Sequence, residues 1–147
     1  MKQALIALFL VLGAFVGLET RLWALEPQKE ASWRSGVMSN YSTETCRYNR
    51  DPACPTASGV SLYTLIRTQT PYAASYEWPL GTWVTICRET GLPPRCVEAV
   101  ILDRGPAKRL GRLIDVSPDV FQALYPLSQG LGRVRVREIT ETSGVRG

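Results

Sequence analysis

The sequence predicts an all-β domain whose short strands close into a small barrel. Three observations lead to this prediction: short strand-like runs recur along the chain, glycine and proline separate them, and only one or two short helices are expected. Many short strands with such turns are typical of closed barrels. With 147 residues, the chain has room for one core of this kind but not for two.

Residues 1–25 are expected to be a signal peptide or a membrane anchor helix. Lys2 precedes the uncharged run 4–18, which is shorter than the roughly 20 residues of a membrane span and matches the apolar region of a secretory signal. Cleavage and retention of this segment both stay open. A linker at 26–35, the barrel at 36–140 and a tail at 141–147 complete the predicted organisation. We therefore expect a secreted, periplasmic or envelope-associated protein that meets a membrane only through its N-terminal segment.

Alternating and apolar runs predict the strands. Residues 36–41 form the first, residues 82–88 contain the β-branched run W-V-T-I-C, and residues 95–102 are its hairpin partner. Residues 132–139 read G-R-V-R-V-R-E-I, so the valines should face the core and the arginines the solvent. Residues 68–75 are expected to be a polar connection.

One short amphipathic helix is expected after Ser117. This serine is placed to cap the helix, Pro118 follows in the first helical position, and apolar residues recur on one face. The run 60–66 is ambiguous between a strand and a short helix. Residues 42–55 form a loop long enough to be functional or pinned in place.

The chain has four cysteines and no histidine. The absence of histidine excludes a Ser-His-Asp or Cys-His mechanism and a histidine-ligated metal, and the cysteines lack C-x-x-C spacing, so we expect no metal or other cofactor. Local pairing of Cys46 with Cys54 and of Cys87 with Cys96 would close a loop and a hairpin. Each bridge would stabilise the fold by about 2 to 3 kcal/mol and would fit an oxidising compartment.

The charge of the chain favours some partners over others. The net charge is +4, and seven basic residues against two acidic ones lie between Arg104 and Arg137. Such an excess favours anionic or hydroxyl-rich partners. Nucleic acid is not expected, because the aromatic residues are not interleaved with the basic ones as a base-stacking surface requires.

Two aspartates at the ends of apolar runs indicate a candidate site. Residues 97–102 lead to Asp103 and Arg104 before a Gly-Pro break, and residues 113–114 lead to Asp115. A buried carboxylate without a partner is costly, so each should be paired with an arginine or hydrogen-bonded to turn amides. The pattern favours either a functional site or two carboxylates that only cap turns.

Five motifs occur in the order and rough spacing of the rare lipoprotein A (RlpA) family: G-V-M-S-N-Y, T-A-S-G, W-P-L-G-T, I-L-D-R-G-P and R-L-I-D-V-S. From about residue 36 to 139, the chain resembles the six-stranded double-psi β-barrel of that family, a relative of barwin and expansin barrels. The resemblance implies an exported barrel that binds peptidoglycan glycan strands or a related wall polysaccharide. Some members cleave these strands as lytic transglycosylases.

The resemblance also implies roles for individual residues. Asp103 would be the catalytic residue, protonating the glycosidic oxygen and then accepting the proton of the muramic acid 6-hydroxyl. The residues implied to bind substrate are Ser39, Asn40, Tyr41, Ser58, Ser75, Glu77, Arg104 and Asp115.

The sequence departs from the pattern of active relatives. Where they have a glutamate directly after T-A-S-G and an aspartate three residues later, this chain has Val60 and Tyr63. Ser75 or a neighbour replaces their histidine, and Glu77 is a candidate substitute. Two alternatives to a cleaving enzyme therefore stay open: an expansin-like barrel that binds glycan without catalysis, and a structural module secured by two disulfides.

Overall fold

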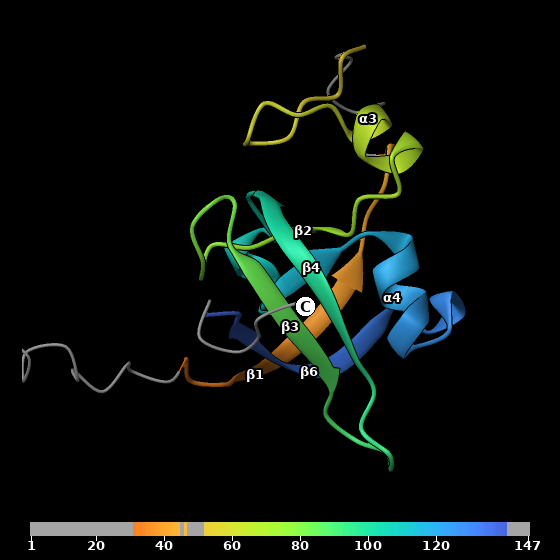
Figure 1. Ribbon diagram of the computed structural model, residues 1–147. Coiled ribbons are helices and arrows are strands. Elements are labelled where there is room, and N and C mark those ends of the chain that lie inside the picture. Colours follow the sequence, from red (N-terminus) through yellow and green to blue (C-terminus); the bar gives the residue numbers. More distant parts are fainter. Residues whose placement is uncertain (1–30, 45, 47–51, 141–147) are drawn as a thin grey trace, which may run out of the picture. The chain divides into compact units, whose positions relative to one another are not determined.

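The computed structural model describes residues 31–44, 46 and 52–140 (Figure 1). Within them, six strands form a closed barrel in the order β1-β5-β2-β4-β3-β6. In chain order the strands are β1 (Arg34–Asn40), β2 (Tyr72–Ala74), β3 (Trp83–Arg88), β4 (Cys96–Asp103), β5 (Ile114–Val116) and β6 (Leu131–Glu138). The apolar segment 1–25 lies outside the described residues.

The register of the short strand β2 brings the two candidate aspartates to one end of the barrel. Strand β2 runs parallel to β4 with Ala74 opposite Asp103, and antiparallel to β5 with Ala74 opposite Asp115. Strand β1 runs parallel to β5 and places Ser39 opposite Asp115. The two carboxylates, twelve positions apart in sequence, therefore flank one buried alanine.

The predicted strands are confirmed with small shifts at their ends. Strand β1 begins at Arg34 and ends at Asn40, and β3 pairs with β4 as the expected hairpin. Strand β6 buries Val134 and Val136 and exposes Arg133, Arg135 and Arg137, as the alternation predicts. The interpretation of residues 68–75 as a polar connection is wrong, because the buried residues Tyr72–Ala74 form β2.

Two α-helices are described in full, α3 (Leu62–Arg67) and α4 (Pro118–Leu124). The ambiguous run 60–66 is helical, and α3 buries Leu62 and Leu65, which lie three residues apart on one face. Helix α4 begins as predicted, with the Ser117 side chain accepting a hydrogen bond from the Val120 amide. It contacts β1 and β4 (Figure 1). No helix among these residues is long and apolar enough to cross a membrane.

Two apolar clusters support the barrel. The larger contains inward-facing residues from all six strands, together with Trp78, Tyr125 and the buried face of α4. The smaller consists of the buried leucines of α3, the Cys46–Cys54 disulfide and Tyr72, with Tyr41 and Leu102 packed against it. The second cluster attaches α3 and the first disulfide to the end of the barrel that carries the aspartates.

Candidate functional site

A cavity of about 400 Å³ lies at the end of the barrel where β4 ends and β5 begins. This volume falls in the range of about 300 to 1,000 Å³ that is typical of small-molecule sites. The cavity is lined by Tyr41, Cys46, Cys54, Pro55, Leu62, Ala74, Asp103, Arg104, Gly105, Pro106, Ala107 and Asp115. Both candidate aspartates therefore belong to one site.

Asp103 is half-buried and held by three donors from this chain. Its Oδ1 accepts hydrogen bonds from the amides of Ala57 and Arg104, at 2.9 and 2.8 Å. Its Oδ2 accepts one from the Tyr41 hydroxyl at 3.3 Å. The T-A-S-G turn is also attached to β4 through the Ser58 amide, which donates to the Leu102 carbonyl at 3.0 Å. The backbone thus fixes the direction of the Asp103 carboxylate.

The side chain of Arg104 is directed away from the neighbouring aspartate. Its Nη1 donates to the carbonyls of Ser75 and Trp78, each at 2.7 Å. Among the described residues, Asp103 and Arg104 form no ion pair. The guanidinium instead anchors the loop that follows β2, which leaves the Asp103 carboxylate to its amide and hydroxyl donors.

Asp115 is almost fully buried, with 9 % of its surface exposed. Its Oδ1 accepts a hydrogen bond from Ser39 Oγ at 2.6 Å, and its Oδ2 pairs with Arg112 Nη2 at 3.3 Å. Burial raises the pKa of Asp115, while Ser39 and Arg112 act in the opposite direction and offset only part of this effect. Sequence reasoning missed Arg112. The only available signal was its position three residues before the aspartate.

Two tyrosines in edge-to-face contact support the Asp103 side of the cavity. Tyr41 and Tyr72 meet edge to face with ring centres 5.3 Å apart, and the Tyr72 hydroxyl donates to the Tyr41 carbonyl at 3.1 Å. Burial raises the pKa of Tyr41 above its ordinary value, and the nearby Asp103 charge adds to this effect. Burial also raises the pKa of Tyr72 to about 12. Both hydroxyls therefore remain donors at neutral pH.

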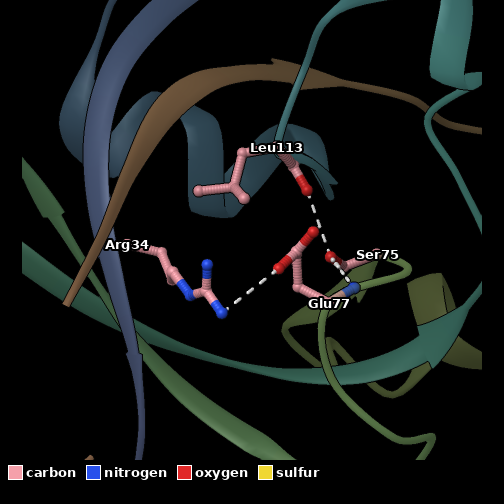
Figure 2. A network of polar contacts seen from close by, with 4 residues as sticks. All are labelled: Arg34, Ser75, Glu77 and Leu113. Carbon is pink, nitrogen blue, oxygen red and sulfur yellow. Dashed lines mark hydrogen bonds and ion pairs between the residues drawn. The ribbon is translucent and has the colours of Figure 1, made fainter. Parts of the chain in front are cut away.

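Several predicted substrate-binding residues, all of them in the described part of the chain, lie outside the lining of the cavity. Ser75 is fully buried, donates to the Leu113 carbonyl at 3.1 Å and accepts from the Glu77 amide at 3.1 Å (Figure 2). The Glu77 carboxylate is directed toward Arg34 of β1, at 3.9 Å (Figure 2). The complete set outside the lining is Ser39, Asn40, Ser58, Ser75 and Glu77.

Both predicted disulfides form, at the two ends of strand β4. Cys87–Cys96 bridges directly opposed positions of the β3–β4 hairpin. Cys46–Cys54 lines the cavity near Asp103, at the other end of that strand. Among the described residues, no group of three or more acidic, cysteine or histidine side chains is placed to hold a metal ion.

No protein-family model matches the sequence, and no curated protein matches it. Several solved structures match the fold of the chain. A mutant of the Clavibacter michiganensis expansin in complex with cellohexaose matches with a TM-score of 0.55 and 15% identity, over 77% of this chain and 53% of the expansin. The Streptomyces papain inhibitor matches with a TM-score of 0.50 and 17% identity, over 74% of this chain and 96% of the inhibitor.

Cerato-platanin 2 from M. perniciosa also matches with a TM-score of 0.50, at 15% identity, over 73% of this chain and 95% of that protein. The fold is a double-psi β-barrel. The predicted six-stranded barrel is thereby confirmed, whereas the resemblance to the RlpA family in particular stays a prediction. The double-psi barrel described here spans about half the length of the expansin.

Proposed function

We propose that this double-psi barrel is an exported RlpA-like protein that binds peptidoglycan glycan strands, or a related wall polysaccharide, without cleaving them. The observation that carries the proposal is the cavity at the end of β4, where backbone amides hold the half-buried Asp103 carboxylate in a fixed direction. A fixed acceptor inside a cavity suits a ligand rich in hydroxyl groups, because each hydroxyl needs a partner when it leaves water.

The free acceptor capacity of Asp103 supports binding. An ionised carboxylate accepts about four hydrogen bonds, and the donors of this chain use three of them. One acceptor position therefore remains for a sugar hydroxyl. The structural match to an expansin that is complexed with cellohexaose supports a saccharide as the ligand of this fold.

The contacts of the two aspartates favour binding over cleavage. A lytic transglycosylase needs a carboxyl group that presents a proton to the glycosidic oxygen. Asp103 instead accepts three hydrogen bonds from groups of this chain. The raised pKa of Asp115 suits a proton donor, and this observation favours cleavage as the second candidate function. Both oxygens of Asp115, however, are already engaged by Ser39 and Arg112.

Export is part of the proposal. Residues 1–25 would serve as the signal peptide or anchor, residues 26–35 as a linker, residues 36–140 as the barrel and residues 141–147 as a tail. The two disulfides support an oxidising compartment, because such bridges persist outside the cytosol.

Co-sedimentation with purified peptidoglycan stripped of its stem peptides tests the function. We expect the protein to sediment with the glycan and the amount of 1,6-anhydromuramic acid ends to stay unchanged. Asp103→Asn should reduce sedimentation, whereas the matched control Glu138→Gln, on an exposed position of β6, should not. New anhydro ends would establish the cleaving enzyme instead. Absence of sedimentation would refute the proposal.

A further inference from the structure

Four basic residues lie between Asp103 and β5, and two of them have hydrogen-bond or ion-pair partners within the chain. Arg104 donates to backbone carbonyls, and Arg112 pairs with Asp115. Lys108 and Arg109 instead lie exposed on the short 3-10 turn η2 (Lys108–Leu110). In the described part of the chain, neither of these two forms an ion pair with an acidic side chain.

The η2 turn adjoins the cavity. Ala107 lines it, and the Cα atom of the next residue, Lys108, lies about 3.8 Å further along the chain. The Lys108 ammonium lies over the exposed ring of Tyr76, with its Nζ 5.8 Å from the ring centre. This contact is within the range of a cation–π interaction and holds the Lys108 ammonium at the loop that follows β2. Lys108 and Arg109 directly follow the lining residue Ala107, and we call this pair the cationic rim.

The charges inside the cavity and on its rim differ in their partners. The lining contains the carboxylates of Asp103 and Asp115 and the guanidinium of Arg104, but Arg112 pairs with Asp115 and two backbone carbonyls accept from Arg104. The rim has two cations with no acidic side chain of the described residues to neutralise them. A negative substituent of a glycan would therefore meet cations without acidic partners at the rim, next to the cavity that accepts its hydroxyls.

We propose that Lys108 and Arg109 bind an anionic substituent, a carboxylate or a phosphate, of the wall glycan whose hydroxyls occupy the Asp103 cavity. This inference rests on the proposed function and adds a specificity to it. The protein should prefer a negatively charged glycan over a neutral one, and added salt should weaken this preference because exposed charges are screened.

Binding of the full chain to four insoluble polymers tests the proposal. The first polymer is wall glycan that keeps its phosphate polymers, and the second is the same glycan freed of phosphate. The third is the phosphate-free glycan with its carboxylates converted to neutral amides. The fourth is cellulose. The test variant is Lys108→Gln with Arg109→Gln. Its matched control is Arg135→Gln with Arg137→Gln, which removes the same charge from β6, where both guanidiniums lie over Trp33.

We expect the rim variant to lose about fivefold to tenfold in affinity for at least one anionic polymer at low salt, and to bind the amidated glycan as the wild type does. Loss confined to the phosphate-bearing glycan identifies phosphate as the group that is bound, and loss on the phosphate-free glycan identifies carboxylate. The β6 control should keep its affinity. Equal losses in both double variants, or an equal loss on the amidated glycan, would overturn the inference. A wild type that binds none of the polymers would instead refute the proposed function.

Discussion

Asp103 and Asp115 have similar sequence contexts and line one cavity, yet their surroundings differ. Asp103 is half-buried, and its donors are two backbone amides and one tyrosine hydroxyl. Asp115 is almost fully buried and engages Ser39 and Arg112, both through side chains. We infer that Asp115 mainly stabilises the barrel, whereas Asp103 is available to a ligand.

The comparison shows that two aspartates opposite the same residue can have different roles. Each aspartate lies opposite Ala74, so both carboxylates lie at the same end of the barrel. What separates them is the solvent exposure of the carboxylate and the identity of its donors. Substitution of Asp115 should therefore mainly lower stability, whereas substitution of Asp103 should mainly lower glycan binding.

The largest effect on stability is expected from Asp115→Ala. The substitution leaves Arg112 and the buried Ser39 hydroxyl without their partner, which should lower the free energy of unfolding by about 2 to 4 kcal/mol. Urea denaturation measures this loss. Asp103→Ala should cost less, because water can reach the amides that it leaves free. A larger loss in Asp103→Ala would contradict the division of roles.

The two disulfides lie at opposite ends of β4 and should also differ in their effect on binding. Removal of either bridge, by Cys46→Ala with Cys54→Ala or by Cys87→Ala with Cys96→Ala, should lower the free energy of unfolding by about 2 to 3 kcal/mol. Only the first pair lines the cavity. Glycan binding, measured where both variants are folded, should fall for the first pair alone. Equal binding by the two variants would show that the first disulfide does not shape the site.

The sequence predicted each aspartate at a strand end but could not predict their closeness. Three residues, Tyr72–Ala74, bring the aspartates together, and a strand this short has too few positions to show an alternating pattern. The hydrogen-bond partners of Arg104 could not be predicted either. Arg104 is the sequence neighbour of Asp103, but its long side chain reaches two carbonyls instead. Helix α4 was predictable because a serine cap and a proline define its start locally.

A smaller effect is expected from Tyr41→Phe. The substitution removes one donor from Asp103 and should lower the free energy of unfolding by about 0.5 to 1 kcal/mol, since the hydrogen bond is long at 3.3 Å. Glycan affinity should fall less than in Asp103→Asn, because the two backbone amides still fix the carboxylate. Tyr63→Phe, on an exposed position of α3, is the matched control and should change neither quantity.

The smallest effect is the pH dependence of stability that Asp115 causes. Because burial raises the pKa of Asp115, the folded protein binds this proton more tightly than the unfolded chain does. The contribution of Asp115 to stability should therefore fall as pH rises from about 4, near the ordinary aspartate value, to the raised pKa. Unfolding curves of wild type and Asp115→Asn across this interval measure it. A difference between them that grows in favour of wild type as pH rises would contradict the burial effect.

The most direct test of the central claim is the affinity of Asp103→Asn for stem-stripped peptidoglycan, measured beside its free energy of unfolding. The side-chain oxygen of the asparagine still accepts from the backbone amides of Ala57 and Arg104. The free energy of unfolding should therefore change by less than about 1 kcal/mol. Affinity should fall about tenfold, because the acceptor that remains for sugar hydroxyls is lost. Unchanged affinity in a stable variant would contradict the assignment of Asp103 to the ligand, and unfolding of the variant would show that this carboxylate, like Asp115, only supports the barrel.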